Sequence, residues 1–426
     1  MKISIYKKRA LAPIISAILL LVVGVILVTI VLSFGKNFTT KSLDSATDFG
    51  KLTASDASLF VFSKIFKDGV VMFSYSPPSY LMDTEITITH YRIVDIPEMT
   101  SVELTTPVTL TASTNIVPLE CLYEYSKSTA DITIQFITTE NKYIEVKTRD
   151  PSLVCTSGGT GTAEDPIIVC DAEDLNAIRL DLDANYSLGK DIDLQCFSRQ
   201  DINGWEPIGT GVSAFSGSLD GQNHKISNLY INRPTADYVG LFGVINASIN
   251  NLKLQDINVI GSDLYTGGLL GRSILGTSLL SQISINGYVS GTGYVGSIAG
   301  AFDGNLSNSW SNATISGGAS TGGLLGSTTD ESYNTFIDNC YYAGVLSGTT
   351  DGGLIETDET GGIFLVTSSY WDTQISGQSA SDGGTGKTTA EMKTQSTFTG
   401  WDFSSIWGMD SSTNSGYPYL RSNPPD

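Results

Sequence analysis

The sequence predicts a mainly β protein in which an N-terminal apolar helix and a small antiparallel β-domain precede a long β-solenoid. Three patterns predict this: glycine-centred segments recur about every 28 residues in the second half, apolar and polar residues alternate between residues 58 and 154, and an uncharged apolar run lies near the N-terminus. A fixed period of roughly 20–50 residues is typical of stacked repeats. We expect a basic N-terminal segment at residues 1–10, the apolar helix and a stalk at 11–56, and a β-sandwich-like domain at 57–156. The solenoid would cover residues 157–388, and a C-terminal cap would cover 389–426.

The repeating segments follow a Gly-x-x-Gly pattern or a close variant. Successive first glycines lie 28, 28, 27 and 30 residues apart, and they are Gly240, Gly268, Gly296, Gly323 and Gly353. Short runs ending in Ser-Gly or Ile-Gly close most units, so each unit supplies two or three short strands. Glycine permits a positive φ and a close approach of neighbouring backbones, so we expect these glycines at the corners of stacked coils. Seven or so coils would give a rod about 35 Å long, at roughly 4.8 Å per coil.

The region before the repeats reads as antiparallel β-structure. Residues 85–89, 131–136 and 143–147 alternate in period two, as half-buried strands do. A glycine-rich joint at residues 157–161 separates this β-domain from the repeats. Asp171 then provides an N-cap for a short helix.

The apolar run covers residues 11–34, which is 24 residues without a charge and enough to span a membrane as a helix. The basic residues 7–9 precede it, and the positive-inside rule then places the chain from Lys36 onward outside the cell. We therefore expect one spanning helix and an extracellular bulk.

The charge balance limits the partners. The chain has 44 acidic and 24 basic residues and a net charge of −20. Such a surface repels nucleic acid, so nucleic-acid binding is excluded.

The chain has five cysteines and no CxxC spacing. This pattern disfavours a zinc or redox centre and allows two disulfides in an extracellular protein, in any of fifteen arrangements. The sequence-local arrangement pairs Cys121 with Cys155 and Cys170 with Cys196. Cys340 would then remain as a small buried side chain.

Residues that could carry chemistry have simpler structural explanations. Residues 383–388 lack one glycine of a phosphate-binding loop and read as a turn before a helix. His90 and His224 belong to no catalytic or metal-binding motif. The pairs Asp181/Asp183 and Asp191/Asp193 could hold Ca²⁺ or serve a glycosidase, but turn positions at a solvated rim are favoured. We expect no catalytic residues, no cofactor and no metal site.

Modification by glycans is a further expectation for a secreted chain. Five N-x-S/T sequons mark candidate sites, at Asn37, Asn185, Asn246, Asn305 and Asn312.

Residues 7–15, Lys-Lys-Arg-Ala-Leu-Ala-Pro-Ile-Ile, resemble the leader of archaeal type IV pilins. The resemblance implies cleavage after Ala10, so that Leu11 becomes the mature N-terminus and Pro13 lies in the first helical turn. Ile15 stands where bacterial pilins have a glutamate. An uncut membrane anchor is the alternative.

A second resemblance covers about 260 residues, from Gly159 to Leu420. Its segments include residues 172–175, 191–194, 205–209, 219–226, 369–372 and 416–420, together with the glycine tetrads. They resemble GLUG-motif repeat proteins, which implies a surface-exposed, adhesin-like module without shared catalytic residues.

These patterns together predict a non-enzymatic cell-surface protein. Residues 11–34 would pack with copies of the same chain in a pilus-like filament core or anchor in membrane lipid, and the solenoid would contact an extracellular surface or glycan. We expect Trp401, Phe403, Ile406 and Trp407 to cap the last coil. The alternative is a membrane-anchored, polysaccharide-acting enzyme built on a β-helix.

Overall fold

A computed structural model describes residues 50–51, 59–65, 70–75, 86–95, 101–110, 116–119, 131–140, 142–149, 154–197, 201–261, 264–328, 333–348, 351–357 and 363–425. The expected leader cleavage at Ala10 and Leu11, the apolar run, Asn37 and Cys121 lie outside these residues. The chain divides into two compact units, Met1–Leu119 with Asp131–Arg149, and Glu120–Ala130 with Asp150–Asp426. Within the described residues, no helix is long and apolar enough to cross a membrane.

The first unit contains two β-sheets. The larger has the strand order β1-β8-β7-β4-β5 and the smaller β2-β3-β6. All pairs are antiparallel except β1 with β8, so the three strands predicted by alternation are confirmed as β4, β7 and β8. The strands are β1 (Gly50–Lys51), β2 (Leu59–Ile65), β3 (Val70–Tyr75), β4 (Ile86–Ile93), β5 (Val102–Leu110), β6 (Ile116–Pro118), β7 (Asp131–Thr138) and β8 (Lys142–Arg149).

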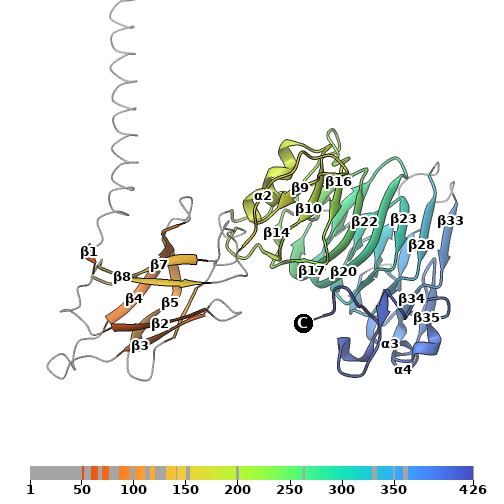
Figure 1. Ribbon diagram of the computed structural model, residues 1–426. Helices are drawn as coiled ribbons and strands as arrows, with labels where there is room; N and C mark the ends of the chain where they lie inside the picture. The colour runs from red at the N-terminus through yellow and green to blue at the C-terminus, as the bar shows by residue number, and fades with distance from the viewer. Residues whose placement is uncertain are drawn as a thin grey trace, which may run out of the picture. The chain divides into compact units, whose positions relative to one another are not determined.

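The second unit is a β-solenoid of about six turns, and its strands form five parallel ladders along the stack (Figure 1). Two long strands, β17 (Ser248–Ile260) and β20 (Ser278–Ser290), bend through ladders A, B and C in succession. Ladder A also contains β9 (Ile167–Val169), β10 (Asn185–Leu188), β12 (Ser218–Asp220), β23 (Gly304–Ser307), β28 (Thr335–Asp338) and β33 (Phe364–Thr367). Ladder B contains β11 (Ile192–Asp193), β13 (Lys225–Ser227), β24 (Trp310–Ser311), β29 (Tyr341–Tyr342), β34 (Tyr370–Asp372) and β35 (Thr385–Lys387). Ladder C contains β14 (Tyr230–Asn232), β25 (Thr314–Ser316) and β30 (Leu346–Ser347).

Ladders D and E complete each coil. Ladder D contains β15 (Tyr238–Val239), β18 (Tyr265–Gly267), β21 (Tyr294–Gly296), β26 (Ser320–Gly322) and β31 (Asp351–Gly352). Ladder E contains β16 (Phe242–Ile245), β19 (Leu270–Ser273), β22 (Ala299–Ala301), β27 (Leu325–Ser327) and β32 (Ile355–Thr357).

Stacked apolar side chains fill the interior of the solenoid. In ladder A one inward column joins five coils, and all its members are at most 1% exposed: Leu219, Ile249, Leu280, Leu306 and Ile337. Each such side chain stabilises the fold by roughly 1.5–3 kcal/mol when fully buried. Stacking therefore supplies the core that no single coil could form.

The glycines of the tetrads lie where ladders D and E meet, and the closing glycine of a tetrad in ladder E approaches the ladder D strand of the preceding coil. A Cβ atom on Gly326 would lie 2.5 Å from the amide nitrogen of Val295, and one on Gly271 would lie 2.7 Å from that of Val239. We call the turn between the ladder D and ladder E strands, which contains these glycines, the glycine arch. None of the five glycines from which the repeat was read has a positive φ. Close approach of a backbone therefore explains the first four, and the Trp371 ring fills the space beside Gly353. The expected left-handed conformation is wrong for these positions.

The true register of the coils differs from the spacing of the tetrads. The aligned column in ladder D is Val239, Thr266, Val295, Thr321 and Asp351, with intervals of 27, 29, 26 and 30 residues. Gly268, Gly323 and Gly353 are the second glycines of Gly-Gly pairs, whereas Gly296 aligns with the first, Gly267. The nearly constant spacing therefore conceals coils of unequal length.

Left-handed residues form the corner between ladders A and B, and they are mostly not glycine. Five stacked positions have φ between 44° and 54°, and they are Asn251, Gln282, Asn308, Asn339 and Ser368. Short polar side chains such as asparagine tolerate this conformation by hydrogen bonding locally. The expectation that glycine makes the corners therefore fails on this side of the coil.

A short helix begins the second unit as predicted. Asp171 caps α2 (Ala172–Ala177) by accepting from the Asp174 amide, and η3 (Ile178–Leu180) continues it. Leu175 and Ile178 are fully buried.

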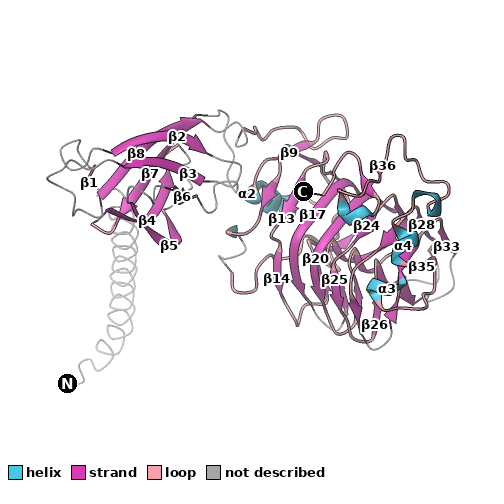
Figure 2. Ribbon diagram, turned by 90° about the horizontal axis from the view of Figure 1, so that it is seen from below, coloured by secondary structure: helices cyan, strands magenta, loops and turns pink. Residues whose placement is uncertain are grey.

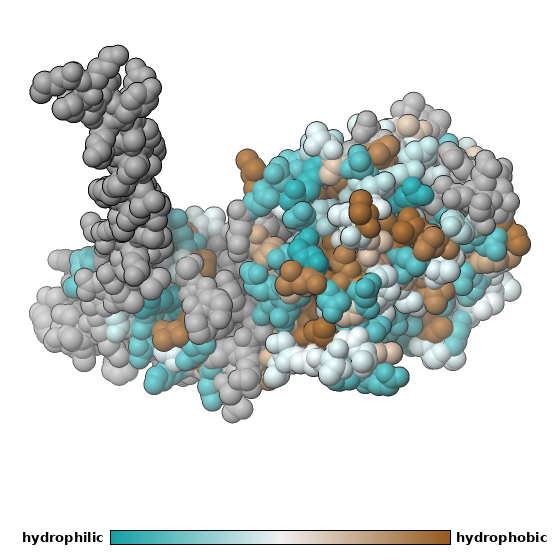
Figure 3. All heavy atoms as spheres, turned by 90° about the horizontal axis from the view of Figure 1, so that it is seen from above, coloured by the Kyte–Doolittle hydropathy of each residue, from teal (hydrophilic) through white to brown (hydrophobic). Residues whose placement is uncertain are grey.

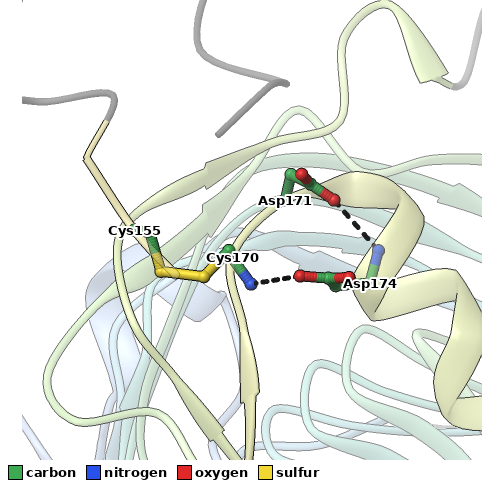
Figure 4. The surroundings of a disulfide bond; sticks show 4 residues. All are labelled: Cys155, Cys170, Asp171 and Asp174. Carbon is green, nitrogen blue, oxygen red and sulfur yellow. Dashed lines mark hydrogen bonds between the residues drawn. A yellow bond between two sulfur atoms is a disulfide. The ribbon is translucent and has the colours of Figure 1, made fainter. Parts of the chain in front are cut away.

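The disulfide arrangement predicted from sequence is wrong. Cys155 bonds to Cys170, with their Cα atoms 5.6 Å apart (Figure 4). The chain before β9 runs beside it, since the Ile168 amide donates to the carbonyl of Gly158, and this brings the two cysteines within disulfide range. Closing the 15-residue separation stabilises the fold by about 3 kcal/mol. Cys196 is also disulfide-bonded, and Cys340 is buried and free.

The C-terminal segment covers a flank of the solenoid instead of capping the last coil (Figure 2). Trp310, Tyr341 and Tyr370 point outward from ladder B, in register with one another. They are buried in one cluster with Met392, Phe398, Trp401, Trp407, Tyr417 and Leu420. The segment contains α3 (Thr373–Ser376), α4 (Thr389–Met392), η5 (Gln395–Thr397), β36 (Trp407–Gly408), η6 (Asn414–Gly416) and β37 (Tyr419–Leu420).

Hydrogen bonds fix this segment along several coils. Trp401 Nε1 donates to the carbonyl of Ser368, and Asn423 Nδ2 donates to that of His224. Residues between α3 and β35 take the expected place of the cap, since the Gly353 amide donates to the carbonyl of Ala380. The flank could not be predicted from the sequence, because the outward aromatic column of ladder B forms only when the coils stack.

Candidate functional site

An open pocket of about 460 Å³ lies outside the early coils, where ladder B turns into ladder C. Two coils supply its floor. Asn228 and Asp256 occupy the corner with φ of 58° and 54°, and Tyr230 and Asn258 are register partners in ladder C. Because of the left-handed corner, polar side chains from both coils line one hollow.

A loop beside β14 forms the pocket wall. The Trp205 amide donates to the carbonyl of Tyr230 at 2.8 Å, and the Asn232 amide donates to that of Asn203 at 2.8 Å. Gly204 has a φ of 67°, and a Cβ atom there would overlap the Tyr230 carbonyl. The wall therefore lies closer to the strand than any other residue would allow. Asp201 and Ile202 are the residues of this wall that line the pocket, and the Ile202 side chain is 86% exposed.

Arg233 fixes this wall. Its guanidinium donates to the carbonyls of Trp205 at 2.9 Å and Gly204 at 3.1 Å, and to Asp201 Oδ2 at 3.1 Å. These bonds hold the loop in place and neutralise one of the two carboxylates that line the pocket.

The base of the wall is anchored in the core. The Trp205 side chain is 1% exposed, and its Nε1 donates to the carbonyl of Leu241 at 3.0 Å. Phe197 packs against its ring at 5.4 Å, and the Arg179 guanidinium lies over it at 5.5 Å. The loop is therefore rigidly supported from below.

Asp193 orients the opposite side of the pocket. Its Oδ1 accepts from Asn228 Nδ2 at 2.8 Å and from the Gln195 amide at 2.9 Å. This bond fixes the orientation of the Asn228 amide at the pocket.

The aspartates considered as catalytic or Ca²⁺ candidates support turns between coils. Asp191 accepts from His224 Nδ1 at 3.0 Å and from the Lys225 amide at 3.2 Å. Burial acts to raise the pKa of Asp191, but these hydrogen bonds outweigh it and the pKa is lowered. Asp183 accepts from the Ser216 hydroxyl.

The remaining candidates occupy ordinary structural positions. His90 lies in β4, with its Nδ1 2.9 Å from Thr89 Oγ1. The glycine-rich residues 383–388 contain β35 and precede α4, which Thr388 and Glu391 cap reciprocally. The predicted helix follows, but half of the predicted turn is a strand. Across the ranges the structure describes, no group of three or more His, Cys, Asp or Glu side chains could hold a metal ion.

The sequons differ in accessibility. Asn305 and Asn312 are exposed. Asn185 is partly buried and its Nδ2 donates to Gly161 at 3.0 Å, and Asn246 accepts from Thr277 Oγ1 at 2.5 Å. Of the four described sequon asparagines, Asn305 and Asn312 are therefore the more accessible.

The solenoid exposes no long apolar stripe on the face shown in Figure 3, where apolar residues lie among hydrophilic ones. The pocket escaped sequence analysis because its wall and floor meet only in the fold. Trp205, in the repeat-like residues 205–209, is the one signal in the sequence that points to the pocket wall.

Comparisons with known proteins show similarity to long proteins. The chain is 29% identical over 349 residues to Halomucin of Haloquadratum walsbyi, which covers 70% of this chain and 4% of Halomucin. It is 37% identical over 123 residues to "Putative Gly-rich membrane protein" of Evansella cellulosilytica, covering 28% of this chain and 14% of that protein. The chain thus spans a small part of the length of both relatives.

No family model matches the chain, so the pilin and GLUG resemblances rest on the sequence segments alone. A solved structure titled as a "putative immunoglobulin A1 protease" from Bacteroides ovatus has a TM-score of 0.47 and 20% identity, covering 62% of this chain and 95% of that chain. At that level the likeness carries no argument about function.

Proposed function

We propose that this is a non-enzymatic cell-surface protein in which the β-solenoid serves as an outward-facing display module. The observation that carries the proposal is how the solenoid uses its residues. Its interior is packed with apolar side chains, and the aspartates that could have been reactive support turns instead. The buried side chains and these aspartates therefore support the solenoid, whose outer surface is left to make contacts with other molecules.

The similarity to Halomucin over 70% of the chain supports this proposal. The name of the second relative includes a membrane location, which agrees with an anchor at residues 11–34. The acidic composition, with a net charge of −20, also favours a soluble surface that does not adhere to anionic lipid.

The finer proposal is a type IV pilin-like filament subunit that carries the solenoid as an adhesive or spacer module. Residues 11–34 would pack against the same residues of other copies, and the leader would be removed after Ala10. It is supported by the leader-like residues 7–15. An uncleaved, membrane-anchored adhesin is the coarser form of the same proposal.

Protease treatment of intact cells tests the surface location. Release of solenoid peptides before lysis supports the proposal, and their release only after lysis contradicts it. Mass spectrometry of material sheared from cells tests the filament. A mature N-terminus at Leu11 in a sedimentable fibre supports a pilin-like subunit, whereas an intact N-terminus confined to membranes contradicts it.

Incubation of the purified chain with polysaccharides tests the absence of enzymatic activity. New reducing ends, or unsaturated sugars detected by ultraviolet absorbance, would overturn the non-enzymatic part of the proposal. An unchanged polysaccharide would support it.

A further inference from the structure

We propose that the pocket between β14, β17 and the loop at residues 201–205 binds a neutral saccharide. This inference rests on the proposed function and gives the display module a class of ligand. The pocket volume of about 460 Å³ lies within the roughly 300–1,000 Å³ of small-ligand sites. It therefore has room for a short saccharide.

The lining carries the chemistry that sugar hydroxyls need. Asn258 and Gln195 have amides that both donate and accept, and Asp256 has a carboxylate that accepts. Neighbouring hydroxyls on a sugar ring are arranged to bond such planar groups in pairs. Tyr230 adds an aromatic side chain with a polar end, which can contact the apolar face of a sugar and hydrogen bond with its hydroxyl.

The same lining argues against anionic ligands. Asp256 faces the pocket beside a carboxylate that Arg233 already neutralises, and the chain carries a net charge of −20. Sulfated or uronate-containing sugars would be repelled. Asp201 and Asp256 are two carboxylates, and no group of three or more His, Cys, Asp or Glu side chains in the described chain could hold a metal ion.

The pocket is formed in advance of binding. Arg233 holds the wall and Asp193 orients Asn228, as described above. A site whose groups are already ordered loses less entropy when a ligand binds. Ile202, exposed at the rim, can contact the apolar edge of the ligand.

The solenoid contains a matched control. Tyr288 is the register partner of Asn258 in the next coil and is 36% exposed. It occupies the same outward column of ladder C as Tyr230, but the loop at residues 201–205 pairs with β14 and not with this coil. Tyr288 thus has the surface setting of Tyr230 without the pocket.

The full chain in detergent would be probed with an array of neutral oligosaccharides of hexoses and N-acetylhexosamines, alongside sulfated and uronate-containing counterparts. The best neutral binder is then titrated by calorimetry. We expect Tyr230→Ala and Asn258→Ala each to weaken binding at least tenfold, Tyr288→Ala to leave it within twofold, and EDTA to have no effect. Melting curves of each variant confirm that the solenoid is folded.

Several results would overturn the inference: no neutral binder, a preference for the anionic sugars, loss of binding with EDTA, equal loss in Tyr288→Ala, or unchanged binding in Tyr230→Ala and Asn258→Ala. The protease treatment of intact cells tests the surface location independently of saccharide binding. Surface exposure without saccharide binding would refute this inference alone, whereas an intracellular solenoid would refute the proposed function.

Discussion

Two sides of the same coils are sealed by opposite means. At the glycine arch, strands of ladders D and E meet backbone to backbone because no side chain stands between them. At the flank of ladder B, the outward residues Trp310, Tyr341 and Tyr370 are among the largest in the chain, and the C-terminal segment buries them. The arch is sealed by contacts between adjacent coils, which recur along the stack, and the flank by one segment that returns from the end of the chain.

The contrast shows which kind of contact leaves a mark in the sequence. A contact between adjacent coils repeats along the stack and therefore appears as a period. A contact between distant segments is made once, and its two halves carry no common spacing. The following predictions separate the two sides, from the largest expected effect to the smallest.

Gly326→Ala should have the largest effect. Its Cβ would lie 2.5 Å from the Val295 amide nitrogen and 2.6 Å from the Gly300 carbonyl oxygen, and backbone atoms cannot move aside as side chains can. We expect a loss of at least about 4 kcal/mol in unfolding free energy, measured by urea denaturation. Gly158→Ala is the control, since nothing lies within 4 Å of the added atom. Equal stabilities would show that the arch is not backbone-limited.

Trp407→Ala should cost about 3 kcal/mol, because it leaves a cavity in the aromatic cluster. The effect should be confined to the flank. Hydrogen exchange should rise in residues 389–425 while amides of ladders D and E keep their protection. Loss of protection throughout the solenoid would mean that the flank and the stack unfold as one unit.

The left-handed corner should respond weakly and in the other direction. Gln282 has a φ of 53°, which costs a residue with a Cβ roughly 1–2 kcal/mol. Gln282→Gly should therefore stabilise the protein by about 0.5 kcal/mol, after the entropy cost of glycine. Asn308→Gly is the matched comparison and should change less, since asparagine already tolerates this conformation. A loss of stability in Gln282→Gly would contradict the strain argument.

Acid should loosen the flank through one exposed carboxylate. Hydrogen bonds from the side chains and amides of Ser404 and Ser405 hold the pKa of Asp402 well below its usual range. The stabilisation is present above the ordinary aspartate pKa of about 3.9 and is lost as pH falls through the lower folded value. Asp402→Asn should therefore show a smaller decline in melting temperature between pH 5 and pH 2. An identical decline in both proteins would show that protonation of Asp402 does not destabilise the flank.

Much of the solenoid could be predicted because its determinants are local. The glycine tetrads predict stacked coils, Asp171 indicates the start of α2, and Thr388 with Glu391 indicates the start of α4. The exact register could not be predicted, since Gly-Gly pairs offer two alignments and only the ladder chooses between them.

The remaining features depend on contacts between distant residues. Cys155 lies next to Cys170 only because the preceding chain runs along β9. The pocket needs Arg233 to reach back to Trp205 and Asp201. Neither pairing has a periodic signal, and neither follows from the types of the residues involved.

The return of the C-terminal segment has a mechanical consequence. Asn423 and Pro424 contact His224 and Lys253 in the early coils, so a pull on residue 425 first breaks those few bonds and then works along the flank toward the last coil. The contacts would yield one after another, as in peeling, while the stacked ladders bear little of the load. Releasing residues 388–425 would lengthen the chain by about 125 Å at roughly 3.3 Å per residue, so the solenoid carries a reserve of extension that costs none of its coils.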